Sequence, residues 1–240
     1  MLTFVLVHGA WHDGSCWDEV VAYLHSIGHI AHAPTIAGNG LGADRRVNHS
    51  VCTKSVVDFI ASRDLHNIVL VGHSYGGTII AKVSETLPHH LKRLVFFNAF
   101  VLNDGQCLFD ETPQNTAHTE RGAKASDDDT FLPSFEMVRD VFFNTASRED
   151  ALRFYHKWTP QPIQPFRDKL DLKKFFASDV PKSYLHATED IRVPMPDLSW
   201  HPRFSNRLRR FRYVAMPGDH EAMYTSPAIL AQKLVQAGRD

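Results

Sequence analysis

A serine flanked by glycines two positions to either side is the clearest chemical signal in the chain. The apolar run Ile68–Val71 predicts a buried strand that stops at Gly72, and a helical pattern begins at Tyr75. Between them stands Ser74, with Gly76 completing the G-x-S-x-G spacing. Such a turn strains the backbone and brings neighbouring segments close together, so a Cβ at either glycine would clash. We therefore predict that Ser74 is a nucleophile presented on a sharp strand-to-helix turn.

A serine nucleophile needs a base within hydrogen-bond reach and an acid that orients the base. His220 directly follows the last predicted strand and precedes the last predicted helix, which distinguishes it from the other histidines. The loop after the preceding strand offers two acids, Glu189 and Asp190, and Asp219 is tied to the same turn as the base. The residues favour Asp190 as the acid and leave Glu189 open, with helix capping as the structural alternative for Asp190.

An acyl intermediate also requires two N–H donors directed at the developing oxyanion. The backbone amides of Ala10 and Tyr75 are the predicted pair, one from the loop after the first strand and one from the residue after the nucleophile. Four side chains are predicted to contact the substrate: Trp11, His12, Cys16 and Trp158. For Cys16 the alternatives are a reactive thiol and a small buried residue.

Alternating strand and helix patterns position these residues. Strands are predicted at 2–7, 29–33, 68–71, 91–99, 181–187 and 208–216, and helices at 16–27, 51–63, 75–87 and 226–237. The alternation predicts an α/β fold with a doubly wound, mostly parallel sheet. Residues 1–102 and 181–240 would form its core.

Residues 103–180 have a different composition and predict an inserted helical cap. The segment 103–129 is polar and is predicted to be a solvated loop. The segment 131–176 has helical spacing and many aromatic residues, and three prolines divide it. Trp158 directly precedes the proline-rich turn, so it is our candidate for a pocket wall. An aromatic cap predicts an apolar pocket and a neutral aryl substrate.

The overall composition excludes several function classes. The chain has 240 residues with 26 basic and 27 acidic side chains, a formal net charge of −1, and no basic stripe that would suit nucleic acid or a membrane surface. Its three cysteines form neither a disulfide framework nor a zinc ligand set. Met1–Val7 resembles a first strand and not a signal peptide. We expect a soluble, cytoplasmic protein that acts on a small molecule without cofactor or metal, and a homodimer is compatible with the sequence.

Four segments of the chain carry a resemblance to a known family. They are Val5-Leu6-Val7-His8-Gly9-Ala10-Trp11, Gly72-His73-Ser74-Tyr75-Gly76-Gly77, Thr188-Glu189-Asp190 and Gly218-Asp219-His220-Glu221-Ala222-Met223. Over its full length the chain resembles the α/β-hydrolase superfamily, in the branch of plant methylesterases and hydroxynitrile lyases. The acid of that branch matches Asp190.

A narrower resemblance rests on three further segments: Trp11-His12-Asp13-Gly14-Ser15, Thr78-Ile79-Ile80-Ala81 and Trp200-His201-Pro202-Arg203. They are similar to bacterial esterases that hydrolyse the carbamate fungicide carbendazim. The resemblance implies a cofactor-free serine hydrolase of a small neutral aromatic ester or carbamate.

Two other classes remain open. A hydroxynitrile lyase or a cofactor-free oxygenase could use the same scaffold. The lyases of the branch carry a lysine directly after the histidine, whereas this chain has Glu221, an anion that would repel cyanide. A ligand-binding receptor with little turnover is the third class.

Overall fold

The core of the molecule is a six-stranded parallel sheet. A computed structural model describes residues 1–193 and 199–240. The sheet has the strand order β2-β1-β3-β4-β7-β8, and every neighbouring pair is parallel. The strands are β1 (Thr3–Val7), β2 (Ile30–His32), β3 (Ile68–His73), β4 (Leu91–Phe97), β7 (Lys182–Ala187) and β8 (Arg212–Met216). The predicted α/β class with a mostly parallel sheet is confirmed.

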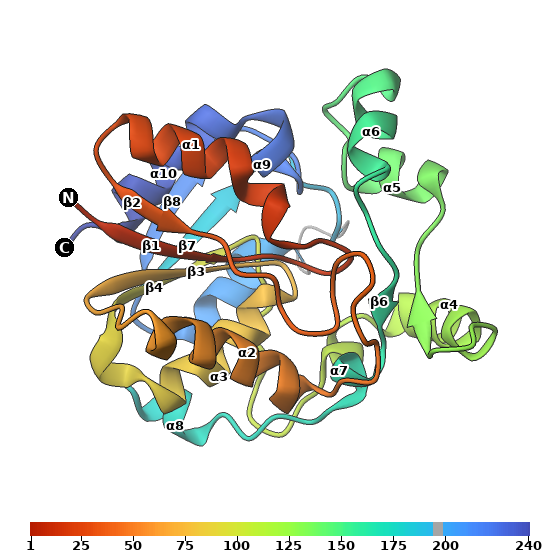
Figure 1. Ribbon diagram of the computed structural model, residues 1–240, viewed down its shortest axis with the longest axis horizontal. Helices are drawn as coiled ribbons and strands as arrows, with labels where there is room; N and C mark the ends of the chain where they lie inside the picture. The colour runs from red at the N-terminus through yellow and green to blue at the C-terminus, as the bar shows by residue number, and fades with distance from the viewer. Residues whose placement is uncertain (194–198) are drawn as a thin grey trace.

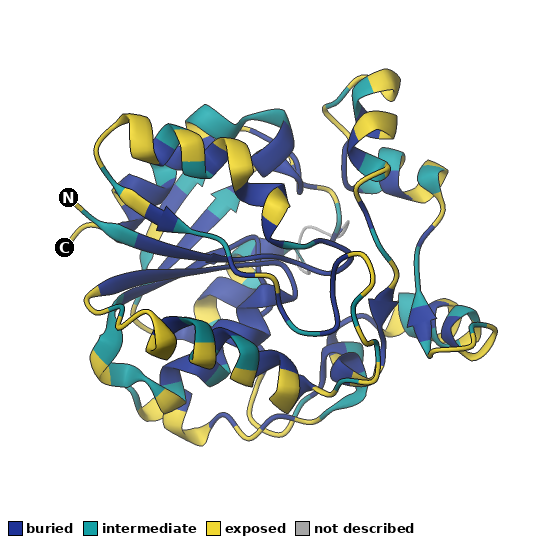
Figure 2. Cartoon of the chain, viewed as in Figure 1, coloured by how far each residue is buried: buried dark blue, intermediate teal, exposed yellow. Residues whose placement is uncertain are grey.

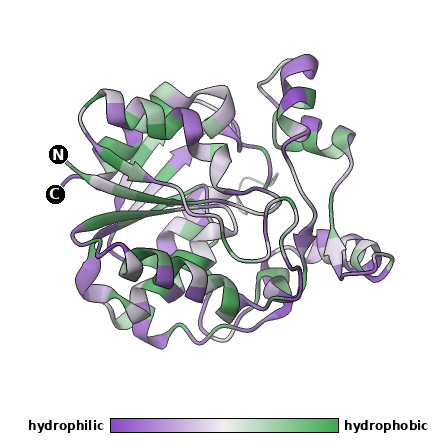
Figure 3. Cartoon of the chain, viewed as in Figure 1, coloured by the Kyte–Doolittle hydropathy of each residue, from purple (hydrophilic) through white to green (hydrophobic). Residues whose placement is uncertain are grey.

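Helices cover both faces of this sheet (Figure 1). One face carries α1 (Asp18–Ser26), α9 (Ala222–Thr225) and α10 (Pro227–Gly238), and the other carries α2 (His49–Ser62), α3 (Gly76–Thr86) and α8 (Lys173–Ala177). Parallel strands that are covered on both faces bury nearly all their side chains, which explains their runs of Val, Leu and Phe. All six residues of β3 are buried (Figure 2), and the strands are correspondingly apolar (Figure 3).

The strand order reverses beside β1, and this reversal locates the site. From β1 the chain first builds β2 on one side and then β3 on the other, so the loop after β1 and the turn after β3 meet at one edge. Open parallel sheets bind ligands at such a switch point, outside the carboxyl ends of the strands. Ala10 and Ser74 follow these two neighbouring strands.

The predicted cap contains three helices and two short strands beside the sheet. These are α4 (Pro113–Lys124), α5 (Phe135–Val141) and α6 (Arg148–Tyr155), with the short antiparallel strands β5 (Thr130–Phe131) and β6 (Gln161–Pro162). Figure 1 shows α4, α5 and α6 standing to one side of the core. By contrast α7 (Gln164–Arg167) and α8 return along α2 and α3, so only the first part of 103–180 stands apart.

One expectation for this region is wrong. The polar segment 103–129 is not a loop throughout, because it contains a 3-10 turn at Leu108–Glu111 and the helix α4. Only Thr119 and Ala123 of α4 are buried, so the helix has almost no apolar stripe that could reveal it in the sequence.

No helix in the described ranges is both long enough and apolar enough to cross a membrane.

Candidate active site

Ser74 occupies the strained turn that its glycine spacing predicts. Its φ is +53°, a left-handed conformation that side chains other than glycine rarely adopt. A Cβ placed on Gly72 would lie 2.6 Å from the carbonyl oxygen of Gly76, and a Cβ on Gly76 would lie 2.6 Å from that of His8. The expected clash at both glycines is confirmed, and it explains how β1, β3 and α3 approach so closely around the serine.

Two backbone amides beside Ser74 have no partner in the part of the chain that the structure describes. The amides of Ala10 and Tyr75 donate to no backbone or side-chain oxygen there. Both residues line a small cavity of about 40 Å³ together with Ser74. Buried N–H groups are almost always hydrogen-bonded in folded proteins. Two unpaired amides at the nucleophile therefore suit an oxyanion hole.

His220 and Asp190 form a buried pair. The Nδ1 of His220 lies 2.6 Å from the Oδ2 of Asp190, and the two side chains are 1% and 0% exposed. A carboxylate accepts and does not donate, so Nδ1 carries the proton and Nε2 remains free to accept one. Glu189 is exposed, so its neighbour Asp190 is the acid that reaches the imidazole. The structure thus resolves which of the two acids contacts the histidine.

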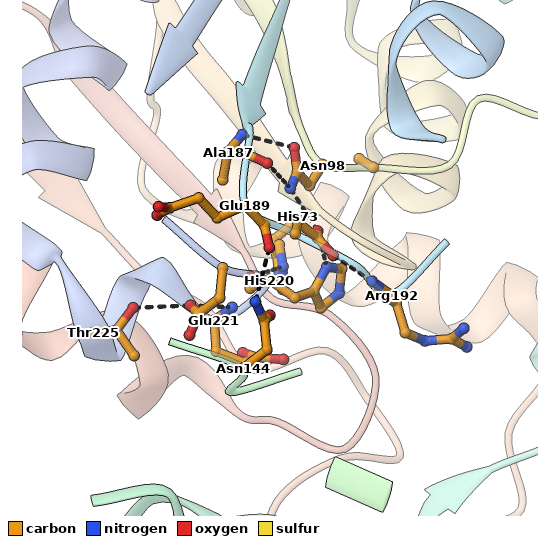
Figure 4. Close-up of polar contacts among 12 residues, drawn as sticks. His73, Asn98, Asn144, Ala187, Glu189, Arg192, His220, Glu221 and Thr225 are labelled. Atoms are coloured by element: carbon orange, nitrogen blue, oxygen red, sulfur yellow. Dashed lines mark hydrogen bonds and ion pairs between the residues drawn. The ribbon is translucent and has the colours of Figure 1, made fainter. Parts of the chain in front are cut away.

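The side chain of Asn98 holds the acid Asp190 in place, a role that the sequence did not reveal. Asn98 follows β4 and donates from Nδ2 to the Oδ2 of Asp190 at 2.5 Å, while its Oδ1 accepts from the amide of Ala187. The other oxygen of Asp190 accepts from the amide of Arg192 at 2.8 Å. Figure 4 shows this network around the acid. With both carboxylate oxygens hydrogen-bonded, Asp190 has a fixed orientation toward the base.

Aromatic rings surround the imidazole of His220. Trp200 is fully buried and stacks on it, with ring centroids 5.3 Å apart and an interplanar angle of 17°. Phe142, from the cap, meets the imidazole edge-on at 5.3 Å. These rings restrict rotation of the base and exclude water from one side of it.

His73 and His8 are structural residues beneath the site. Both are fully buried, and burial holds the pKa of His73 well below its usual range and lowers the pKa of His8 to about 4. His73 donates from Nε2 to the carbonyl oxygen of His220, and its ring lies 4.6 Å from the imidazole of His220. Since Ser74 follows His73 directly, this contact brings the base to the nucleophile's turn.

A second buried pair lies behind the base. Glu221 is 1% exposed, and its Oε2 lies 3.1 Å from the Nε2 of His12, although the two groups are poorly aligned for a hydrogen bond. The Nδ1 of His12 donates to the carbonyl oxygen of Ala10 at 2.6 Å, because a carbonyl can only accept. His12 thus fixes the peptide of Ala10, and the carboxylate of Glu221 lies both against His12 and within 4.8 Å of a ring nitrogen of His220.

Of the four predicted substrate contacts, only Trp11 lines the cavities beside Ser74. Trp158 lies behind it, with stacked rings 5.4 Å apart at an interplanar angle of 3°. Cys16 is buried, and burial raises the pKa of its thiol well above the usual range, so the thiol stays protonated. None of His12, Cys16 and Trp158 lines either cavity, and the ring of Trp158 packs against the rings of both Trp11 and His12; contact of these three side chains with the substrate stays a prediction.

Trp11 also joins the core to the cap. It has a φ of +66°, its indole N–H donates to the carbonyl oxygen of Phe131, and its amide donates to the side chain of Gln161. Beyond it lies a larger cavity of about 290 Å³ whose lining combines apolar cap residues such as Met137 and Phe142 with polar ones such as Asn115 and His118.

The turn between α5 and α6 bonds to the loops of both the acid and the base. Asn144 donates from Nδ2 to the carbonyl oxygen of Glu189, and Thr145 donates from Oγ1 to the Oδ2 of Asp219 at 2.7 Å. Figure 4 shows Asn144 reaching the acid loop. Burial raises the pKa of Asp219, whereas hydrogen bonds from Thr145 and Thr225 lower it. The cap therefore contacts the backbone next to Asp190 and the side chain next to His220.

The known proteins that this chain resembles are hydrolases and esterases. Residues 4–233 match a family model described as "Alpha/beta hydrolase family". A carbendazim hydrolyzing esterase from Nocardioides sp. (strain SG-4G) is 28% identical, with 99% of this chain and 100% of that protein covered. Methylesterase 2 of Arabidopsis thaliana is 26% identical, with 97% of this chain and 94% of that protein covered.

A solved structure is more similar still. It is described as an extracellular alpha/beta-hydrolase from a Paenibacillus species that shares structural and functional homology with Tobacco Salicylic Acid Binding Protein 2. It is 42% identical to this chain and superposes with a TM-score of 0.97 over all of both chains.

Proposed function

The chain belongs to the alpha/beta hydrolase family, as its motifs indicated, and on that premise we propose that it is a serine esterase for a small neutral aromatic ester or carbamate. One observation carries the proposal. Ser74 and two unpartnered amides share a single small cavity, and the buried pair of His220 and Asp190 is held against the same turn. This is the set of groups that acyl transfer requires.

In the proposed reaction Ser74 attacks the substrate carbonyl while the Nε2 of His220 accepts its proton. The amides of Ala10 and Tyr75 stabilise the oxyanion, and Asp190 stabilises the imidazolium. When the intermediate collapses, His220 returns the proton to the departing alcohol. Water then attacks the acyl-enzyme by the same route and frees the serine.

The cavities support a substrate with one small and one large part. The space beside Ser74 is about 40 Å³, much smaller than the neighbouring cavity under the cap, and suits only a small group such as a methyl. The cavity of about 290 Å³ under the cap suits an aromatic group. A methyl ester or a methyl carbamate of an aryl amine has this division. A carbamate such as carbendazim, the substrate named for the Nocardioides relative, would give methanol and a carbamic acid that loses carbon dioxide to leave the amine.

Glu221 argues against a hydroxynitrile lyase. Its buried side chain directly follows His220 and would place negative charge near a departing cyanide. The proposal therefore stays with hydrolysis.

A panel of aryl methyl esters, aryl methyl carbamates and amides, assayed with wild type and Ser74→Ala, tests the proposal. We expect a burst of alcohol release at the start of the reaction with an activated ester and no turnover in the variant. Binding without turnover in the wild type would instead identify a receptor. Equal turnover by the variant would exclude a serine mechanism.

A further inference from the structure

The two cavities beside Ser74 adjoin, and one charged side chain lines both. They share Trp11, Asn115, Thr119 and Arg192. Of these, only Arg192 carries a permanent charge. A substrate with its carbonyl at Ser74 and its ring in the larger cavity must pass this side chain.

The guanidinium of Arg192 has no acceptor among residues 1–193 and 199–240. Within those ranges Arg192 donates a hydrogen bond only from its backbone amide. Its guanidinium carbon lies 5.0 Å from the centroid of the Phe142 ring. By contrast, two other partly buried arginines have carboxylate partners: Arg167 bonds Glu120, and Arg207 bonds Glu111. Apolar surroundings lower the pKa of Arg192, which indicates that it has lost part of its hydration.

The position of Arg192 is fixed relative to the catalytic groups. Its amide donates to the Oδ1 of Asp190 at 2.8 Å. In Figure 4 its side chain extends away from His220. A guanidinium carries five N–H donors and no acceptor, and partly buried donors without a partner are costly.

We propose that Arg192 is a specificity residue that donates hydrogen bonds to an acceptor on the aryl part of the substrate. On a neutral substrate the acceptor is a ring nitrogen or a carbonyl oxygen; a carboxylate also fits a guanidinium donor and serves below as a charged probe. The proposal rests on the proposed function, because it assumes that the aryl group occupies the larger cavity.

Equilibrium binding to a Ser74→Ala protein tests the proposal without turnover. The probes are methyl benzoate, the three methyl pyridinecarboxylates and the three monomethyl esters of benzenedicarboxylic acids. The ring nitrogen adds a neutral acceptor at almost no change in shape, and the dicarboxylic half-esters add a charged one. The measured quantity is the affinity of each probe relative to methyl benzoate, with and without Arg192→Met.

We expect at least one pyridine isomer and one half-ester to bind better than methyl benzoate, and Arg192→Met to reduce that preference by roughly 10- to 100-fold. Arg192→Lys should restore the preference for the half-ester more than for the pyridine, since it keeps the charge but loses the planar fork. The matched control is Arg148→Met. Arg148 also lies 5.0 Å from a ring centroid, that of Phe135, but lines neither cavity.

Three results would overturn the inference: no preference in the parent protein, the same loss for every probe in Arg192→Met, or the same change in Arg148→Met. The proposed function fails separately, when Ser74→Ala still hydrolyses methyl esters at the wild-type rate. If turnover depends on Ser74 but the probe affinities do not depend on Arg192, only this inference is contradicted and the proposed function stands.

Discussion

Ser74 and His220 are expected to act as one unit, because the serine is a weak nucleophile without its base. Replacing either with Ala should lower kcat by roughly a thousandfold to a millionfold, and the double variant should be little worse than the poorer single variant. Steady-state kinetics on an activated aryl ester, with circular dichroism as a check on folding, measure both effects. Losses that multiply would show that the two residues act independently.

Asp190 should matter far more than its neighbour. Asp190→Asn keeps the shape but gives the histidine a donor where it needs an acceptor, so kcat should fall by about a thousandfold or more. Glu189→Gln should change kcat little, since that side chain is exposed. The reverse ranking in the same assay would contradict the hydrogen-bond geometry.

The sequence identified catalytic candidates that directly follow predicted strands. It did not identify residues whose role depends on packing between distant segments. Ser74 and His220 follow strands at one sheet edge, which a pattern can reveal. The roles of Asn98 and Trp200 were not predicted, because they contact Asp190 and His220 only after distant segments meet. Likewise, sequence proximity to Trp11 suggested His12 as a substrate contact, whereas its ring packs against Trp158 and bonds the backbone of Ala10.

Among the elements, strands and core helices were predictable because burial on both faces leaves long apolar runs. The helix α4 was not, since its residues are polar all round and its position depends on Phe131, which lies against Gly122. The cap boundaries at 103 and 180 stay a prediction. Within them, α7 and α8 lie against the core helices.

The turn between α5 and α6 should affect catalysis through the loops that it contacts. Asn144→Ala and Thr145→Val remove its two side-chain hydrogen bonds to these loops, so the backbone beside Asp190 and the side chain of Asp219 are held less firmly. We expect kcat to fall by about tenfold and Tm to fall by roughly 2–8 °C, for a loss of about 1–2 kcal/mol.

The matched control for the turn is Ser147→Ala, which removes the N-cap of α6 in the same segment without touching the core. It should lower Tm and leave kcat near the wild-type value. An equal loss of kcat in the control would mean that general loosening of the cap, and not the contact with the catalytic loops, explains the effect.

At the scale of the whole molecule, buried neutral histidines should make the fold sensitive to acid. Burial lowers the pKa of both His8 and His49 to about 4. Between pH 6.5 and 4 the unfolded chain therefore binds protons that the folded chain does not, so stability rises with pH across this window and is lost as pH falls through it. Each histidine accounts for about 3 kcal/mol at the acid end.

Calorimetric Tm values from pH 4 to pH 7 check this expectation. His49→Gln removes one titrating group while leaving a side chain that can bond Thr53 and Thr78, so its Tm should depend less on pH. A variant with the same pH dependence as the wild type would show that His49 is not among the responsible groups.

The cellular location stays a prediction. The similar solved structure from a Paenibacillus species is described as extracellular, and the three cysteines of this chain are all free and buried. The fold thus uses no disulfide that a reducing compartment would break.

The left-handed backbone of Ser74 has a consequence for how this site can evolve. A positive φ costs a serine about 1–3 kcal/mol that a glycine does not incur. Ser74→Gly and Ser74→Ala should both be inactive, yet the glycine variant should melt several degrees higher than the alanine variant. Selection for thermal robustness alone would thus tend to erase the nucleophile, and the persistence of serine at this position would record continuous selection for turnover.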